Sequence, residues 1–298
     1  MTDKKMKIGA HTVELSNLDN VLFPDDGITK GDLIDYYRHI AETMLPHLAG
    51  HPLSLQRFPG GIQAEGFYQK EIPEYFPDWI RRVSIEVKEE QTRQAQVVCD
   101  TLETLVYLAN QACLTLHPWL SRADQLNYPD KLIFDLDPPG DEFEVVRFAA
   151  GRLREMLQEV GLVPFVMSTG SKGLHVVAPL DRSADFDKVR AFVRQLANEL
   201  ASREPERLTT ETRKDQRHGR VFLDYLRNAY AQTGVAPYTV RAKVGAPVAT
   251  PLEWDELANP SLHSQSYTLR NIFHRLGQKA DPWQDMMDHA RSLNGGQS

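Results

Sequence analysis

The pair Asp135 and Asp137 has the spacing that most directly suggests chemistry in this sequence. Both lie in the segment FDLDPP at residues 134–139. Side chains alternate along a strand, so a strand here would place both carboxylates on one face and the apolar side chains on the other. Adjacent carboxylates repel each other unless a cation lies between them, and their hard oxygen atoms suit Mg²⁺ or Mn²⁺. The alternative is a pair of solvated acids at a strand end.

A third carboxylate, Asp224, lies in a second apolar run at residues 221–226. On a strand, Asp224 would lie opposite its apolar neighbours. A buried carboxylate without a partner is costly, so Asp224 requires a metal ion or another cation. An ion pair with Arg220 or Arg227 is the alternative to a metal. Three carboxylates are enough to hold two divalent ions, which can activate an attacking oxygen and stabilise a leaving one in phosphoryl transfer.

The segment STGSKGLH at residues 168–175 lies between two predicted strands. Its glycines permit close approach of the backbone, and consecutive N–H groups can form a nest for an anion. Lys172 adds a positive charge for a phosphate, and His175 begins the next strand, where it can donate to a phosphate oxygen. The alternative is an ordinary hairpin turn.

Two groups of basic residues flank Asp224. The first group is Arg213, Lys214, Arg217, His218 and Arg220. The second, Arg241 and Lys243, alternates within residues 238–244, which we predict to be a strand that carries both cations on one face. The alternative for each group is a solvated charged edge.

The elements that must position these groups alternate between helical and strand patterns, which predicts an α/β (α+β) fold. Thr29 with Asp32, and Asp100 with Glu103, have the spacing of capping boxes, and Gly50 and Gly161 follow two helix ends. Apolar periodicity predicts helices at 29–49, from 100 onward, at 142–160 and at 185–201. Alternation and short apolar runs predict strands at 53–58, 83–87, 95–98, 132–136, 164–167, 174–178 and 221–225.

The composition is that of a soluble globular protein, with 298 residues, 41% hydrophobic and 25% charged. We expect a single catalytic domain over 1–298, with a core at about 12–260 and a helical extension at 261–298. The N-terminus lacks the apolar segment of a signal peptide, no apolar run approaches the roughly 18 residues that span a bilayer, and two cysteines are too few for a disulfide framework. We therefore expect buried thiols, no membrane partner and a cytoplasmic location. The net charge of −7 means that any binding of nucleic acid must rely on local basic patches.

Taken in order, these motifs resemble the archaeo-eukaryotic primase superfamily, and most closely the polymerase domain of bacterial DNA ligase D. The resemblance covers about 15–257 and rests on LDNVLFP at 18–24, TKGD at 29–32, FDLDP at 134–138, GSKGLH at 170–175 and FLDYLRN at 222–228. It implies a primase-like fold, with two mixed β-sheets flanked by helices and the active site in the groove between them.

The resemblance also implies roles for individual residues. Asp135 and Asp137 would bind both divalent cations, Mn²⁺ in preference to Mg²⁺, and Asp224 mainly the one that activates the primer 3′-hydroxyl. The residues around the incoming NTP or dNTP would be Thr169, Ser171, Lys172 and His175, with Arg241, Lys243 and Arg217 on phosphate oxygens. His117 matches a family histidine near the nucleotide, and a core histidine at a helix end is its alternative.

For DNA, the resemblance implies a pocket for the 5′-phosphate of a downstream strand, with Lys30 and with Asn20 where the family commonly has a second lysine. Arg57, Phe67 and Tyr68 match residues that contact the template, where aromatic stacking is worth roughly 1–3 kcal/mol per base. An ordinary hydrophobic hairpin is the alternative for the two aromatic residues.

The implied activity is template-directed extension of primer 3′ ends and filling of short gaps in bacterial non-homologous end joining, with a preference for ribonucleotides. The implied substrates and partners are gapped or 3′-overhang DNA, Ku and a DNA ligase module, in the bacterial nucleoid. We expect no ligase or nuclease module after Leu257, so the chain would be an excised domain or a stand-alone polymerase. Three alternatives are a primase that starts chains de novo, an Asp-x-Asp phosphatase of haloacid-dehalogenase type, and a non-catalytic binder of DNA ends.

Overall fold

The structure, a computed structural model, describes residues 4–87, 92–140 and 142–293. The chain divides into two compact units. Unit 1 comprises residues 1–119, 235–248 and 268–270, and unit 2 comprises 120–234, 249–267 and 271–298. Because each unit draws on separate stretches of the sequence, neither is a contiguous half of the chain.

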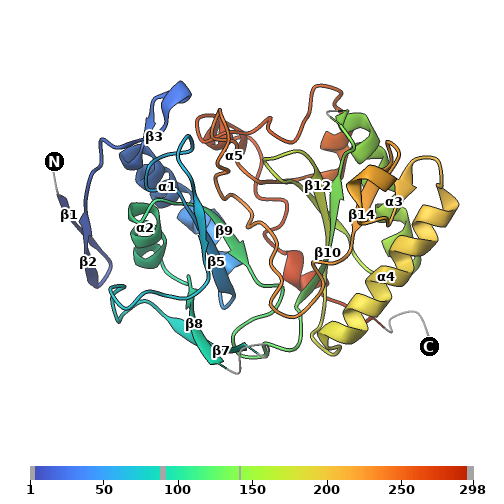
Figure 1. Cartoon of the computed structure of the whole chain (residues 1–298), viewed down its shortest axis with the longest axis horizontal. Helices are drawn as coiled ribbons and strands as arrows, with labels where there is room; N and C mark the ends of the chain where they lie inside the picture. Colours follow the sequence, from blue (N-terminus) through green and yellow to red (C-terminus); the bar gives the residue numbers. More distant parts are fainter. Residues whose placement is uncertain (1–3, 88–91, 141, 294–298) are drawn as a thin grey trace. The chain divides into compact units, whose positions relative to one another are not determined.

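Unit 1 is built on a sheet whose described strand pairs all run antiparallel. Strand β5 (Pro52–Arg57) pairs with β6 (Phe67–Gln69), β8 (Thr92–Val98) and β9 (Cys113–Pro118), and β8 also pairs with β7 (Arg82–Val87). The hairpins of the unit are β1 (Lys4–Ile8) with β2 (His11–Leu15), and β3 (Val21–Phe23) with β4 (Ile28–Thr29). Its helices are η1 (Pro24–Asp26), α1 (Lys30–Leu48) and α2 (Leu102–Asn110). Helices α1 and α2 lie side by side (Figure 1).

The first predicted helix is confirmed together with its cap. The Thr29 side chain accepts a hydrogen bond from the Asp32 N–H, and the Asp32 carboxylate accepts one from the Thr29 N–H, as in a capping box. The predicted cap of α2 is wrong by one residue, because Thr101 caps this helix. Asp100 instead accepts hydrogen bonds from the Gly50 N–H and from Arg81, so contacts distant in sequence take up its carboxylate.

Unit 2 contains a six-stranded mixed sheet in the order β13-β14-β10-β12-β11-β15. Only β13 and β14 pair in parallel among its described strands. The strands are β10 (Lys131–Asp137), β11 (Phe165–Ser168), β12 (Leu174–Pro179), β13 (Leu208–Thr209), β14 (Val221–Asp224) and β15 (Thr250–Leu252). The helices are α3 (Phe143–Glu159), α4 (Phe186–Arg203), α5 (Ile272–Leu276) and the short η2 (Lys214–Gln216), η3 (Trp254–Ala258) and η4 (Met286–His289).

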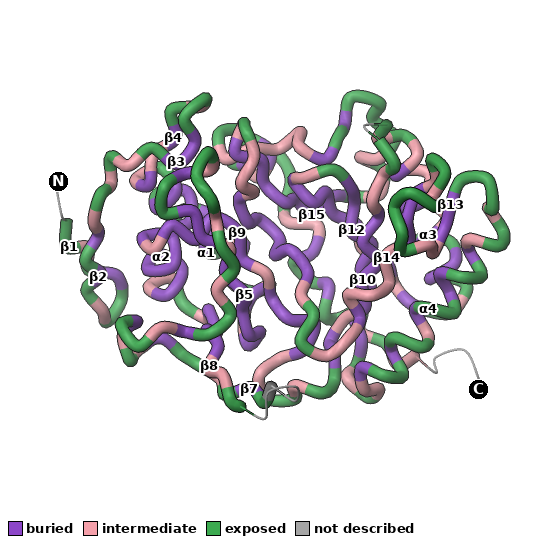
Figure 2. The backbone as a smooth tube through the Cα atoms, in the orientation of Figure 1, coloured by how far each residue is buried: buried purple, intermediate pink, exposed green. Residues whose placement is uncertain are grey.

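The core of unit 2 forms between one face of this sheet and the helices α3 and α4. Leu132, Phe134 and Leu136 contribute from β10, and Val221 and Leu223 from β14, as the alternation predicted. Both central strands, β10 and β12, are almost entirely buried (Figure 2). Since side chains alternate, the aspartates of β10 and β14 lie on the sheet face away from the two helices.

Two further predictions are corrected or limited by the structure. Residues 238–244 form a loop with a turn and no strand, and Tyr238 has a φ of 63°, which an extended strand does not allow. The helical extension at 261–298 contains only α5 and η4 within its described part, and 294–298 lie outside the described residues.

Cys99 and Cys113 are buried free thiols, as expected. Within the described ranges, no helix combines the length and apolar character needed to cross a bilayer.

Candidate active site

The three predicted aspartates converge in unit 2 on neighbouring strands. In the antiparallel register of β10 and β14, Asp135 lies directly opposite Asp224. In the register of β10 and β12, Asp135 also lies directly opposite His175. Directly opposed residues point to the same face of a sheet, so Asp224, Asp135 and His175 form a row across three strands. Asp137 follows two residues later on the same face of β10.

The electrostatics of this row are those of crowded acids. The pKa of Asp137 is raised, first by burial and then by the charges of Asp135 and Asp224. The pKa of Asp224 is raised as well, mainly by burial, although the Leu226 N–H donates to its Oδ1 at 2.8 Å and opposes this shift. The fold therefore holds acids that are harder to ionise than acids in water, which is the environment that attracts a cation.

Arg227 and His175 are basic side chains that contact these acids. Arg227 places its Nη2 3.2 Å from Asp135 Oδ2 and its Nε 3.7 Å from Asp224 Oδ2. The predicted alternative for Asp224, an ion pair with Arg227, is thus present in the structure. His175 Nε2 lies 3.3 Å from Asp135 Oδ1, and its buried Nδ1 has no hydrogen-bond partner in the described part of the chain.

The donor set fits a divalent cation of the Mg²⁺ or Mn²⁺ class. Asp135, Asp137 and Asp224 offer only carboxylate oxygens, which these ions prefer. A bound cation would offset the burial and the mutual repulsion that raise the pKa values of Asp137 and Asp224. Across 4–87, 92–140 and 142–293, no three His, Cys, Asp or Glu side chains are already arranged around one point as a metal cage.

The predicted phosphate loop connects β11 to β12 beside this row. Thr169 is buried and organises the loop, because its hydroxyl donates to the Gly173 carbonyl and accepts from the N–H groups of Ser171 and Gly173. These two N–H groups are therefore already engaged inside the loop. Lys172 is exposed and Ser171 is half-buried, so their side chains are the parts of the loop that can meet a phosphate.

Gly173 has a packing role that its place in the motif did not reveal. A Cβ atom at this position would overlap the carbonyl oxygen of Leu136 on β10. The absence of a side chain lets the loop lie directly against the strand that carries Asp135 and Asp137. The loop and the acids are thereby held at a fixed separation within unit 2.

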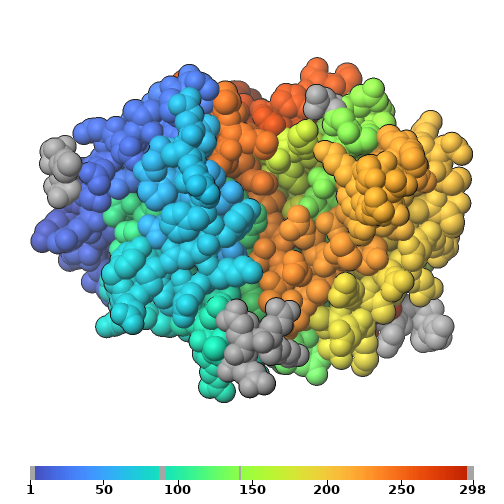
Figure 3. Space-filling model, in the orientation of Figure 1, coloured from blue at the N-terminus to red at the C-terminus, as the bar shows by residue number. Residues whose placement is uncertain are grey.

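Among the predicted phosphate-binding arginines, only Arg217 lies in unit 2. Its guanidinium lies 4.0 Å from the ring centre of Phe222 and donates to the carbonyls of Glu211 and Thr212. Its charge lowers the pKa values of Asp137 and Asp224, against the larger effect of burial. The β13–β14 loop that carries it, gold in Figure 3, lies at the surface of unit 2.

In unit 1, the two predicted 5′-phosphate residues are neighbours. The Asn20 carbonyl accepts a hydrogen bond from the Lys30 N–H, and the Asn20 side chain donates to the Pro59 carbonyl. Lys30 is only 5% exposed, and its Nζ donates to Ser16 Oγ at 3.4 Å. A buried ammonium group of this kind is suited to an anion that reaches it from solvent.

The predicted template residues also lie together in unit 1. Arg57 lies 5.4 Å from the ring centre of Phe67 and donates to Gln69, Tyr75 and Gln111. Phe67 and Tyr68 are 47% and 60% exposed, which leaves both rings available for stacking. His117 is half-buried on β9, with its ring centre 5.7 Å from that of Tyr68. Its strand position differs from the helix end that its core alternative assumed.

Arg241 and Lys243, the remaining predicted phosphate ligands, are half-buried in the loop of unit 1 described above. The loop is anchored by Asp26, whose carboxylate accepts from the Gly245 N–H at 2.7 Å. Because the segment is not a strand, alternation does not place these two cations on one face. Their predicted contact with phosphate stays a prediction.

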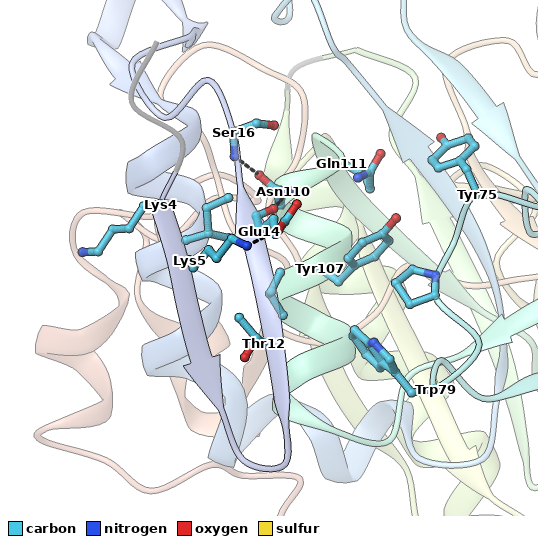
Figure 4. A pocket seen from close by; sticks show the side chains of 13 residues that line it. Lys4, Lys5, Thr12, Glu14, Ser16, Tyr75, Trp79, Tyr107, Asn110 and Gln111 are labelled. Atoms are coloured by element: carbon cyan, nitrogen blue, oxygen red, sulfur yellow. Dashed lines mark hydrogen bonds and ion pairs between the residues drawn. The ribbon is translucent and has the colours of Figure 1, made fainter.

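A cavity of about 550 Å³ in unit 1 was not foreseen from the sequence (Figure 4). It is lined by the β1–β2 hairpin, by the end of α2 and by an aromatic segment that includes Tyr75 and Trp79. None of the predicted site residues lines it, although Lys30 and Arg57 contact residues that do, namely Ser16, Tyr75 and Gln111. Only tertiary packing creates this cavity, and no local sequence pattern marks it.

Comparison with known proteins gives a consistent result. Residues 29–283 match the family described as the LigD primase-polymerase domain. The chain is 35% identical over 265 residues to the multifunctional non-homologous end joining DNA repair protein LigD of Mycobacterium tuberculosis. It is 30% identical over 276 residues to the bifunctional non-homologous end joining protein LigD of Bacillus subtilis. These alignments cover 86% and 92% of the chain, but only 34% and 44% of the two relatives, so the chain spans less than half of their length.

Among solved structures, the chain resembles the polymerase domain of Mycobacterium tuberculosis ligase D in complex with DNA. The TM-score is 0.86 with 30% sequence identity, and the alignment covers 93% of this chain and 99% of that one. The α+β fold expected from the sequence is thus confirmed.

Proposed function

Because the chain belongs to the family of LigD primase-polymerase domains, we propose that it extends primer 3′ ends by template-directed transfer of nucleotides. The observation that carries this proposal is the row of Asp224, Asp135 and His175, with Asp137 beside it on the same sheet face. Family membership sets aside the phosphatase alternative. The retained trio of acids argues against a non-catalytic binder of DNA ends, and no observation favours de novo priming over extension.

The proposed reaction is attack of the primer 3′-hydroxyl on the α-phosphate of a bound nucleoside triphosphate, with release of pyrophosphate. Two divalent cations, when bound, would activate the hydroxyl and stabilise the leaving group. Asp135 and Asp137 would hold both ions, and Asp224 mainly the one nearer the hydroxyl. We propose Mn²⁺ as the preferred ion and ribonucleotides as the preferred substrates, as the family resemblance implies.

The chain's own groups would position the nucleotide. Ser171 and Lys172 would face the triphosphate from the loop that Thr169 organises, and His175 would donate to a phosphate oxygen from β12. We assign further phosphate contacts to Arg217 in unit 2 and to Arg241 and Lys243 in unit 1. His117 is assigned to the nucleotide as well. We propose that the two units act as one catalytic domain, since each is assembled from interleaved stretches of the chain.

The proposed DNA substrate is a gap or a 3′ overhang whose downstream strand carries a 5′-phosphate. Support comes from the buried ammonium of Lys30 beside Asn20 and from the exposed rings of Phe67 and Tyr68 next to Arg57. The named relatives are end-joining proteins, and the similar solved structure is a complex with DNA. We propose that the chain fills short gaps at double-strand breaks in the bacterial nucleoid, together with Ku and a DNA ligase.

Primer extension tests the proposed function directly. The purified chain is expected to add ribonucleotides to a primer opposite a template gap in the presence of Mn²⁺, and to lose this activity when EDTA removes the metal. A nucleotide mismatched to the template should be added far more slowly. Extension that ignores the template, or that persists in EDTA, would contradict the proposal.

Lys30→Ala is expected to weaken binding to gapped DNA that carries a 5′-phosphate by about tenfold, because a charge-assisted contact with the phosphate is lost. Binding to the same DNA without the phosphate should change little. Fluorescence anisotropy with both DNAs measures the difference, and Lys188→Ala, an exposed lysine on α4, is the matched control. Equal losses on both DNAs would mean that Lys30 is a general backbone contact. Circular dichroism shows whether the variant remains folded.

A further inference from the structure

Arg227 lies between two acids that face each other across neighbouring strands. Its Nη2 is 3.2 Å from Asp135 and its Nε is 3.7 Å from Asp224. The side chains of Asp135 and Asp224 are only 11% and 14% exposed, whereas that of Arg227 is 43% exposed. The guanidinium thus reaches from solvent into the position where a cation would relieve the repulsion of the two carboxylates.

The backbone next to Arg227 is anchored in the core of unit 2, whereas its side chain is 43% exposed. The next residue, Asn228, is fully buried and holds the turn against β10 by hydrogen bonds with the N–H and carbonyl of Ile133. The guanidinium itself makes its hydrogen bond to Asp135 alone among the described residues. A long, partly exposed side chain on a rigid turn can move out without disturbing the strands.

The other basic groups near the acids are placed differently. Arg217 donates to two backbone carbonyls and stacks on Phe222, which already engages its guanidinium. His175 contacts Asp135 from β12 and is almost fully buried. Within the described residues, Arg227 is the cationic side chain that contacts both Asp135 and Asp224.

We infer that Arg227 is an internal counter-cation that holds Asp135 and Asp224 together in the metal-free protein and is displaced when a divalent ion binds. A divalent ion held by both carboxylates would lie close to the Arg227 guanidinium, and the two positive charges would repel each other. The divalent ion carries the larger charge and therefore displaces the guanidinium. Binding of the ion therefore competes with an ion pair inside the protein, and Arg227 lowers the affinity of the site. This inference rests on the metal site of the proposed function.

Titration with Mn²⁺, followed by isothermal calorimetry and by the electron paramagnetic resonance of free Mn²⁺, tests the competition. Arg227→Gln is expected to bind Mn²⁺ about three- to tenfold more tightly than the original chain, since the competing ion pair is lost. Arg213→Gln is the matched control, because Arg213 forms an ion pair with the exposed Asp215. The affinity of this variant for Mn²⁺ should equal that of the original chain. Equal or weaker binding by Arg227→Gln would overturn the inference and make Arg227 a support for the acids.

Thermal unfolding gives a second readout. Arg227→Gln should melt at a lower temperature than the original chain in EDTA, because two buried acids lose their partner, and the difference should vanish in saturating Mn²⁺. A difference that persists in saturating Mn²⁺ would show that Arg227 still pairs with the acids in the loaded protein, against the inference. Asp137→Asn separates the two proposals. If Asp137→Asn binds Mn²⁺ as tightly as the original chain does, the proposed metal site is wrong, and the inference about Arg227 fails with it.

Discussion

Asp137→Asn is expected to abolish primer extension and, at neutral pH, to raise the melting temperature of the metal-free protein. The loss of a metal-binding carboxylate should reduce extension by at least about a hundredfold. The gain in stability follows from the raised pKa of Asp137, which burial and the charges of Asp135 and Asp224 cause. Each kcal/mol relieved should raise the melting temperature by about 2–4 °C.

The sign of the pH dependence follows from this raised pKa. Because the folded-state pKa lies above the unfolded one, the proton on Asp137 stabilises the fold below the unfolded pKa. That contribution is lost as pH rises through the folded pKa. The advantage of Asp137→Asn should therefore be largest at neutral pH and should shrink as the pH falls. Melting curves in EDTA between about pH 4 and pH 8 measure it.

Asp215→Asn is the control of opposite sign. The Asp215 carboxylate is exposed, and its pKa is lowered by hydrogen bonds, first that from Gln216 and also that from Arg213. Its replacement should slightly destabilise the protein at neutral pH and leave extension unchanged. Wild-type extension by Asp137→Asn would refute the metal assignment, and a lower melting temperature would refute the repulsion argument.

Asn228→Leu should destabilise the protein by about 2–5 kcal/mol. Asn228 is fully buried, its Oδ1 accepts from the Ile133 N–H at 2.9 Å, and its Nδ2 donates to the carbonyls of Ile133 at 2.7 Å and Tyr225 at 2.9 Å. A leucine would leave buried backbone groups of β10 without partners. Urea denaturation monitored by circular dichroism measures the change in the free energy of unfolding.

The same substitution should also reduce Mn²⁺ binding at temperatures where the protein is still folded, because Asn228 holds the end of β14 and hence Asp224 opposite Asp135. Asn198→Ala is the matched control, since Asn198 is exposed on α4 and accepts a hydrogen bond from Thr210. Its effect on stability should stay within about 0.5 kcal/mol. Equal effects of both substitutions would show that Asn228 has no special structural role.

Local signals were enough to predict the elements that carry the site. The cap of Thr29 and Asp32 depends on residues three apart, and the alternation in β10 depends on a single strand, so both were readable from short segments. Where contacts between residues distant in sequence determine the backbone conformation, local patterns were insufficient. Residues 238–244 alternate like a strand, but the Tyr37 hydroxyl donates to the Leu114 carbonyl and accepts from the Val240 N–H, which fixes that segment as a loop.

The site itself shows the same division. The types and spacing of Asp135, Asp137 and Asp224 predicted a cation site, but only the pairing register of β10 and β14 places Asp224 opposite Asp135. The contact of Arg227 with Asp135 depends on that register too. Asn228 ends the motif FLDYLRN, but the motif did not reveal its structural role, because the hydrogen bonds to Ile133 depend on the packing of its turn against β10.

The packing of Gly173 against the Leu136 carbonyl constrains how such an enzyme can change over evolution. Because the loop backbone contacts the β10 backbone directly, there is no space for an inserted residue or a bulkier side chain at this point. The distance between the β11–β12 loop and the aspartates of β10 is therefore constrained. Variation within this loop is therefore expected at the side chains of Ser171 and Lys172, which are half-buried and exposed, respectively, and take no part in this backbone contact.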